Sequence, residues 1–191
     1  MGFYSRSELY NLGLKKVGVN VKVSNKVSIY NPQNIVLGDN VRIDDFCVIS
    51  AGEEGIILGR NVHIACFSSL IGQARIELGD FSGVSSRVSI YSSSDDYLGH
   101  AMTNPTVPQN YTKVEHKNVI IGRHAIIGAG SIVLPGADIS EGVAIGALSL
   151  VKGSCSSWFI YGGNPLQKLV KRRKGCLIKE NEYLLDEKNN K

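Results

Sequence analysis

Long apolar runs are missing from this sequence. None approaches the 18 or so residues of a membrane-spanning helix, so we expect no membrane insertion. The N-terminal stretch MGFYSRSELY lacks the apolar centre of a secretory signal, and a cytoplasmic location is expected. With 43% hydrophobic and 20% charged residues, the 191-residue chain fits one soluble domain with at most a small appendage.

Paired cysteines and convergent histidines are missing too. Cys47, Cys66, Cys155 and Cys176 form no CxxC pair, and the spacing of the histidines does not supply a three-histidine zinc site, so no metal is expected. Residues 168–179 carry six Lys and Arg side chains and no acid. Because no recognition motif or interleaved aromatics accompany them, we expect no nucleic-acid partner but a phosphate-bearing small ligand. A solvated helix face is the alternative for most of these side chains.

What the sequence does contain is a six-residue repeat. Between residues 119 and 151 an aliphatic residue returns at every sixth position: Ile121, Ile127, Val133, Ile139, Ile145 and Val151. Four residues after each comes a small residue or valine: Ala125, Ser131, Ala137, Val143, Ser149 and Cys155. A period of six fits neither an α-helix nor an alternating strand, but it fits a parallel β-helix in which each hexad makes one side and one corner. Both sets are expected to point inward.

The same register extends backwards in triplets. Its earlier positions are Val17, Val23, Ile29, Leu37, Ile43, Ile49, Leu58, Ile64, Leu70, Leu78, Val84 and Ile90. Three hexads therefore close one triangular coil, and the extra residues between triplets leave at one recurring corner. The first position of a triplet is followed by Gly18, Gly38, Gly59, Gly79, Gly122 and, in the last triplet, Ser140. A positive φ is expected at the glycines, as it is at the nearby Asn20, Asn40 and Asn61. The prediction is an all-β prism of about six coils over residues 17–156.

Three segments lie outside the hexads. Ser5 and Glu8 form a capping box for a short helix at 5–13, so residues 1–16 are expected to cap the bottom of the prism. Residues 91–118 form a long polar insertion, and insertions of this length in a compact fold are usually functional. In the C-terminal segment 157–191, Asn164 followed by Pro165 predicts the start of a helix that runs to about Leu185.

The hexads resemble those of the left-handed β-helix acyltransferases, the hexapeptide-repeat family, over nearly the whole chain. Residues 30–50, YNPQNIVLGDNVRIDDFCVIS, and 85–97, SSRVSIYSSSDDY, are most similar to the small N-acyltransferases of nucleotide-linked amino sugars, of the anthrose and viosamine type. This resemblance implies the left-handed coil, acetyl-CoA as a co-substrate with no permanently bound cofactor, and a homotrimer with active sites between subunits.

The resemblance also implies a coenzyme A site. Gly128, Ala129, Gly146 and Ala147 are small corner residues against which an extended pantetheine chain could lie, although turn geometry alone is the alternative for the glycines. The run Gly163, Asn164, Pro165 and Lys168 resembles the family's coenzyme A segment. Lys168 and Arg172 are expected to meet the phosphates as charge-assisted partners.

The family commonly places a histidine in a segment reading S-H-D-Y, and this chain departs from that pattern. It reads Ser94, Asp95, Asp96 and Tyr97, so Asp95 occupies the histidine position. The departure argues against a hydroxyl acceptor, which needs a strong base, and favours an amine, which needs alignment. The catalytic candidates are Asp95 and Ser85, the latter expected at a corner facing the loop.

Four residues are expected to contact the sugar substrate: Ser94, Asp96, Tyr97 and Arg87. For Arg87, an ion pair with Asp95 or Asp96 is the alternative. The expected activity is transfer of an acetyl group from acetyl-CoA to a nucleotide-linked amino sugar for surface polysaccharide synthesis, with a dTDP-4-amino-4,6-dideoxy sugar favoured by resemblance. Whether the nucleotide is dTDP, UDP or GDP, which amine is acylated and how long the acyl chain is stay open.

Two rivals remain. An O-acetyltransferase would act on a sugar hydroxyl, and its activity would not require a nucleotide. A non-catalytic structural β-solenoid would show ladders of threonine or charge along one wall, and no such ladder is present.

Overall fold

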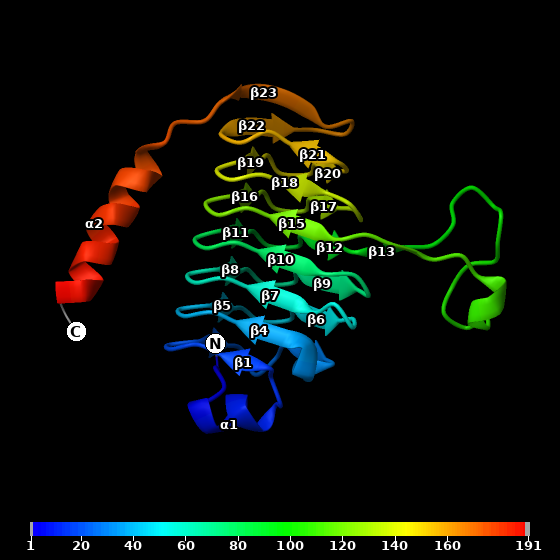
Figure 1. The fold of residues 1–191 in the computed structure, drawn as a ribbon, viewed down its shortest axis with the longest axis horizontal. Coiled ribbons are helices and arrows are strands. Elements are labelled where there is room, and N and C mark those ends of the chain that lie inside the picture. Colours follow the sequence, from blue (N-terminus) through cyan, green and yellow to red (C-terminus); the bar gives the residue numbers. More distant parts are fainter. Residues whose placement is uncertain (1, 190–191) are drawn as a thin grey trace.

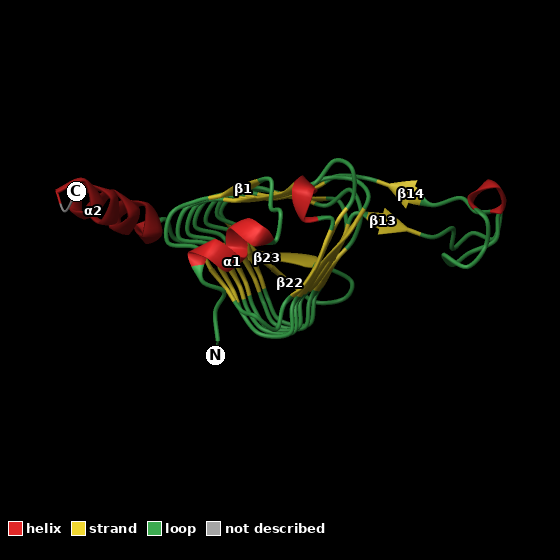
Figure 2. Ribbon diagram, turned by 90° about the horizontal axis from the view of Figure 1, so that it is seen from below, coloured by secondary structure: helices red, strands yellow, loops and turns green. Residues whose placement is uncertain are grey.

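The computed structural model describes residues 2–189 and is a parallel β-helix with three flat sides (Figures 1 and 2). Each coil contributes one strand to each of three sheets, and equivalent strands of successive coils pair in parallel. Among the described residues six coils are complete and a seventh has two sides, so the predicted architecture of about six coils is confirmed with one partial coil added. Met1, Asn190 and Lys191, which belong to the predicted terminal segments, lie outside the described residues.

The strands are short, as the hexads require. The first sheet runs β1 (Lys16–Val17), β4 (Ile35–Leu37), β7 (Ile56–Leu58), β10 (Ile76–Leu78), β15 (Val119–Ile121), β18 (Asp138–Ile139), β21 (Ser154–Cys155). The second runs β2 (Lys22–Val23), β5 (Arg42–Ile43), β8 (His63–Ile64), β11 (Gly83–Val84), β16 (Ile126–Ile127), β19 (Ala144–Ile145), β22 (Phe159–Gly162), β23 (Gln167–Lys171). The third runs β3 (Ser28–Tyr30), β6 (Val48–Ala51), β9 (Ser69–Gly72), β12 (Ser89–Tyr91), β17 (Ile132–Val133), β20 (Leu150–Val151).

The interior is filled by the residues that the hexads predicted. All eighteen aliphatic positions are buried except Val17 and Ile29, which are partly buried against the same core. The second inward set is buried as well, and its two serines satisfy their hydroxyls by donating to the Gly146 carbonyl, at 3.0 Å from Ser131 and 2.7 Å from Ser149. Small residues are needed at these positions because the walls of the prism converge there.

The first corner, between the first and second sheets, corrects one expectation. Asn20, Asn40 and Asn61 have φ of 55°, 58° and 56°, as predicted. The glycines that precede them do not adopt positive φ, so that part of the prediction is wrong. A Cβ on Gly38, for example, would lie 2.6 Å from the carbonyl carbon of Gly59 in the next coil. Close stacking of the coils, not backbone handedness, therefore requires glycine at this position.

Both ends of the prism are covered. The helix α1 (Arg6–Asn11) caps the first coil, and the predicted capping box between Ser5 and Glu8 is present. At the other end the predicted helix at Asn164 is wrong, because β22 and β23 form an antiparallel hairpin there. The peptide bond between Asn164 and Pro165 is cis and lies in the turn of this hairpin. The extra strand lies on the last parallel strand and covers the sheet edge, which would otherwise expose unpaired backbone groups.

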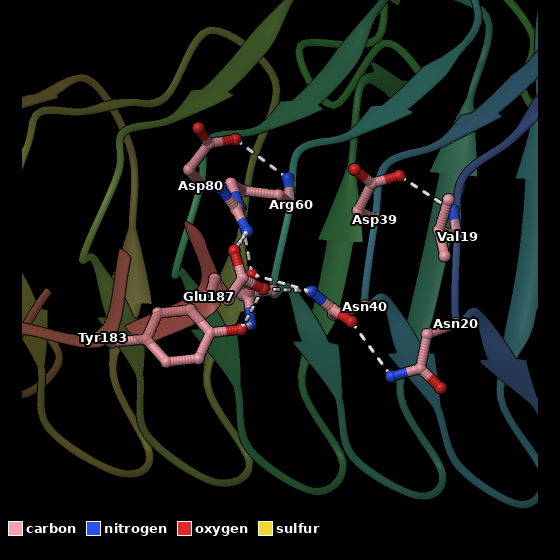
Figure 3. A network of polar contacts seen from close by, with 9 residues as sticks. Val19, Asn20, Asp39, Asn40, Arg60, Asp80, Tyr183 and Glu187 are labelled. Atoms are coloured by element: carbon pink, nitrogen blue, oxygen red, sulfur yellow. Dashed lines mark hydrogen bonds and ion pairs between the residues drawn. The ribbon is translucent and has the colours of Figure 1, made fainter. Parts of the chain in front are cut away.

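The C-terminal helix α2 (Gly175–Asn189) runs down the first corner (Figures 1 and 2). Its Glu187 bonds to Arg60 at 2.5 Å (Figure 3). Its Tyr183 accepts a bond from Asn61 at 3.3 Å. Further up the helix, Glu180 is almost fully buried and bonds to both Arg123 and His124. No helix among residues 2–189 is both long and apolar enough to cross a membrane.

Insertions leave at the third corner, between the third sheet and the first sheet of the following coil, as predicted. One of them contains the short 3-10 helix η1 (Pro32–Asn34). The longest is the loop 91–118, which starts and ends in an antiparallel pair, β13 (Ser93–Ser94) and β14 (Glu115–His116), and contains η2 (Gln109–Tyr111). Figure 2 shows this loop extending away from the prism, far from α2.

Candidate active site

The second corner, between the second and third sheets, gathers six of the predicted site residues. Its tight turns repeat in coils two to six, with positive φ at Phe46, Phe67, Arg87, Gly130 and Leu148. The two residues before each turn residue therefore stack along the prism. From these stacked residues we select five in coils four to six and call them the second-corner strip: Ser85, Gly128, Ala129, Gly146 and Ala147.

The second-corner strip has the chemistry that an extended amide chain needs. Ala129 and Ala147 are exposed, and within residues 2–189 their backbone N–H groups have no hydrogen-bond partner. Two free donors on successive coils can bind carbonyl oxygens of a chain such as pantetheine. Gly128 must be glycine also for packing, because a Cβ there would lie 2.4 Å from the amide nitrogen of Ala147. Around Gly146 the nearest atom would be 3.4 Å away, so its small size leaves space on the surface.

The turn of the β22–β23 hairpin continues the strip upward. Gly163 donates its N–H to the hydroxyl of Ser149 at 3.0 Å and accepts from the Leu150 amide at 3.2 Å, which fixes the turn above the sixth coil. Asn164 and Pro165 follow it and are exposed. The predicted coenzyme A segment therefore lies beside the predicted corner residues, although in a hairpin and not in a helix.

The two cations of this segment have different surroundings. The ammonium of Lys168 lies 3.6 Å from the centre of the Phe159 ring and is exposed. Arg172 is partly buried, and its Nη1 donates to the carbonyls of His124 at 2.7 Å and Gly142 at 3.1 Å. Lys168 is thus available to a ligand phosphate, whereas Arg172 clamps the upper coils together.

A second part of the site lies where the loop joins the third corner. An open hollow of about 1190 Å³, which we call the loop cavity, lies between coils two to four and the loop. Its polar lining includes Gln73, Ser94, Asp95, Lys113 and His116. The carboxylate of Asp95 is exposed and makes no hydrogen bond or ion pair within residues 2–189. An unengaged carboxylate on a cavity wall is available to a ligand.

The other loop residues predicted to bind substrate divide into two groups. Ser94 lines the cavity and donates to the Asp95 carbonyl at 3.2 Å, whereas Tyr97 is 91% exposed and outside the cavity lining. Asp96 orders the loop by accepting the backbone N–H groups of Leu98 at 2.9 Å and His100 at 2.6 Å, together with that of Ala101. These bonds, first of all the one from Leu98, hold the pKa of Asp96 below its usual value even though desolvation opposes them. Its oxygens are therefore already engaged.

Two expectations about Ser85 and Arg87 are wrong. Ser85 lies at the second corner, and the loop leaves the third, so the whole of β12 separates Ser85 from Asp95. Arg87 pairs with neither Asp95 nor Asp96; its guanidinium lies over the Phe67 ring at 5.3 Å. Phe67 in turn stacks on Phe46, with ring centres 5.1 Å apart. Arg87 is thereby held at the exposed surface beside Ser85.

The sequence missed three members of this region. Gln73 and Lys113 line the loop cavity but belong to no motif, and the stacked Phe46 follows no signal except its place one residue after a pair of aspartates. No group of three or more His, Cys, Asp or Glu side chains within residues 2–189 is arranged to hold a metal ion.

The chain is similar to characterised proteins over most of its length. No protein-family model matches it. It is 48% identical over 183 residues to the dTDP-4-amino-4,6-dideoxy-D-glucose acyltransferase of Escherichia coli, covering 96% of this chain and 95% of that protein. It is 28% identical over 152 residues to a putative lipopolysaccharide biosynthesis O-acetyl transferase of Escherichia coli K12, covering 78% and 74% of the two chains.

Among solved structures, AntD, an N-acyltransferase from Bacillus cereus in complex with dTDP and 3-hydroxybutyryl-CoA, matches with a TM-score of 0.94 and 44% identity, covering 98% of this chain and all of that one. AntD variants at one serine and one aspartate have also been solved with coenzyme A. A maltose O-acetyltransferase from Clostridium difficile, at 21% identity and a TM-score of 0.58, shares the fold alone. The predicted left-handed β-helix acyltransferase is confirmed, and the chain belongs to the N-acyltransferases of nucleotide-linked amino sugars.

Proposed function

We propose that this protein transfers an acetyl group from acetyl-CoA to the amino group of dTDP-4-amino-4,6-dideoxyglucose. The observation that carries the proposal is the presence of two half-sites on the same chain. A coil corner offers unpaired N–H groups to pantetheine, and a loop cavity offers an unengaged carboxylate to an amine. The curated relative acts on this dTDP sugar, and AntD binds dTDP and an acyl-CoA. The reaction would take place in the cytoplasm, where acetyl-CoA is used, and its product would enter surface polysaccharide.

The chemistry requires little of the protein beyond alignment. The neutral amine attacks the thioester carbonyl, a C–N bond forms, the C–S bond breaks, and the ammonium proton passes to the departing thiolate. Asp95 accepts a hydrogen bond from the amine and holds its lone pair toward the carbonyl carbon. Ser85 donates to the acyl oxygen, where negative charge develops. The serine and the aspartate changed in the AntD variants are ten positions apart, which is also the spacing of Ser85 and Asp95.

The two half-sites meet only between protomers. Ser85 and Asp95 of one chain are separated by a full side of the prism, roughly 15–20 Å for a side of five or six extended residues. A neighbouring copy that places its loop against the second corner brings its Asp95 to this Ser85. Three copies around one axis satisfy this relation for every site, so the proposed assembly is a homotrimer.

Thiol release from acetyl-CoA and 3-hydroxybutyryl-CoA, measured against a panel of dTDP- and UDP-linked amino sugars and their hydroxyl analogues, tests the activity. Turnover that requires a nucleotide-linked amine is expected, with the amide product identified by mass spectrometry. Turnover only with a sugar hydroxyl would instead establish an O-acetyltransferase.

The shared site has its own test in mixed trimers. Protomers carrying Ser85→Ala and protomers carrying Asp95→Ala are denatured and refolded together. A site built from two protomers regains both side chains in about a quarter of random pairings, so activity should rise toward that fraction of wild type. If activity stays at the level of the parent variants, the two residues act within one chain.

A further inference from the structure

The stem of the loop contains a chain of hydrogen bonds that ends at His116. The Gln73 backbone N–H donates to the Ser93 hydroxyl at 2.8 Å, and that hydroxyl lies 2.8 Å from Nδ1 of His116. Ser93 and His116 face each other across the β13–β14 pair. Directly below them the Lys117 N–H donates to the Ser92 carbonyl at 3.0 Å. The imidazole is thus fixed to the body of the prism although the loop beyond it projects into solvent.

The first of these bonds has a fixed direction, and the second can be formed by either tautomer of the imidazole. A backbone N–H is always a donor, so the Ser93 oxygen accepts from Gln73 through one lone pair. Its single proton is then free to be donated to Nδ1 of His116, whereas in the other tautomer its second lone pair would accept from Nδ1–H. A neutral imidazole that accepts at Nδ1 carries its proton on Nε2. Within residues 2–189 no partner engages Nε2. In this tautomer His116 presents an oriented and unused N–H donor.

This donor lies on the wall of the loop cavity together with a cation. His116 and Lys113 line the cavity from the returning arm of the loop, whereas Asp95 lines it from the outgoing arm. One arm thus supplies positive and N–H groups, and the other supplies a carboxylate. A nucleotide-linked amino sugar has the complementary arrangement, with a diphosphate at one end of the sugar and an amine on its ring.

We propose that His116 binds the acceptor through a hydrogen bond from its Nε2–H to a diphosphate oxygen, and that Ser93 acts as a positioning residue by fixing the imidazole tautomer. This inference rests on the proposed function, since it assigns the diphosphate end of the same acceptor. Lys113 adds charge to that end of the cavity. Asp95 and His116 then select a substrate by the separation between its amine and its diphosphate.

Binding of dTDP, measured by isothermal titration calorimetry, tests the proposal without depending on turnover. His116→Ala should weaken dTDP roughly tenfold, the loss expected for one oriented hydrogen bond to a charged oxygen, while the Kd for coenzyme A stays unchanged. His116→Gln keeps an N–H donor at a similar reach and should recover much of the affinity. His100→Ala is the matched control, because that histidine is on the same loop but outside the cavity lining. Thermal unfolding confirms that each variant is folded.

To show that Ser93 sets the tautomer of His116, and does not merely stabilise the stem, the measurement must report on the imidazole itself. Nitrogen-15 NMR of the imidazole should show the Nε2–H tautomer in the wild type and a tautomer mixture in Ser93→Ala. In a double-mutant cycle, Ser93→Ala should cost dTDP affinity in the wild type but almost none when His116 is already alanine.

The outcomes separate the two proposals. Equal dTDP affinity for wild type and His116→Ala, or an Nδ1–H tautomer in the wild type, would overturn the role of His116 and leave the proposed activity intact. A wild-type protein that does not bind dTDP but acetylates another acceptor would overturn both.

Discussion

Replacement of Asp95 by asparagine separates two roles for the residue at the centre of the proposed reaction. Asparagine keeps an oxygen that can accept a hydrogen bond from the amine, but it loses the negative charge and cannot take up a proton. The change is nearly isosteric, and the carboxylate makes no bond within residues 2–189 that the fold would lose. Any effect on turnover therefore reports on the substrate and not on the stability of the loop.

The size of the effect identifies the role. Loss of one oriented hydrogen bond to a charged group is worth about 1.5–3 kcal/mol, or roughly 10–100-fold. Loss of a general base typically costs 10²–10⁴-fold. Because an amine needs alignment more than deprotonation by the enzyme, we expect Asp95→Asn to lose roughly 10–100-fold in kcat/KM, with a raised KM for the sugar.

The assay is thiol release from acetyl-CoA, with kcat and KM measured across pH for both proteins. Glu115→Gln is the matched control, because it removes a negative charge from the same stem but not from the cavity lining. A variant reduced by more than about 10⁴-fold at every pH, but still able to bind the sugar, would show that Asp95 is the essential base and refute the orienting role.

Three further predictions follow from the contacts. Lys168→Ala should raise the KM for acetyl-CoA roughly tenfold with no change in Tm. Arg172→Ala, which removes hydrogen bonds to carbonyls of the coils, should instead lower Tm. A KM for acetyl-CoA that is unchanged in Lys168→Ala but raised in Arg172→Ala would place the coenzyme elsewhere. Although desolvation opposes it, bonding to His124 and Arg123 lowers the pKa of Glu180, so docking of α2 should be complete above the unfolded value of 4.5 and weaken as pH falls below it. Amide protection factors in α2, corrected for the intrinsic pH dependence of exchange, that do not fall with pH would contradict this. Burial raises the pKa of the Cys47 thiol to about 11, so it should resist thiol reagents until the protein unfolds, and rapid labelling of the folded protein would be the contrary result.

The hexad period by itself determined the body of the molecule. A side chain at every sixth position can be buried repeatedly only if the chain returns to the same place after a fixed number of residues, so the inward residues from Val23 to Val151 could be identified without coordinates. The corner asparagines were predictable for the same reason, because Asn40 and its equivalents tolerate a positive φ locally. Cys155 of the small inward set is buried for that reason, as is Cys47, which follows Ile43 by the same four residues.

Contacts between residues far apart in the sequence determined the features that local patterns could not predict. Asn164 and Pro165 are typical of a helix start, but the unpaired edge of the last coil binds the returning chain as a strand instead. Gly38 and its equivalents must be glycine because the backbone of the adjacent coil leaves no room for a Cβ, and sequence spacing does not reveal this contact. Ser85 and Asp95 are close in sequence yet lie on different corners, because one side of the prism separates them. Ser93 and His116, which are 23 residues apart, meet only because both strands of the stem leave from the same corner.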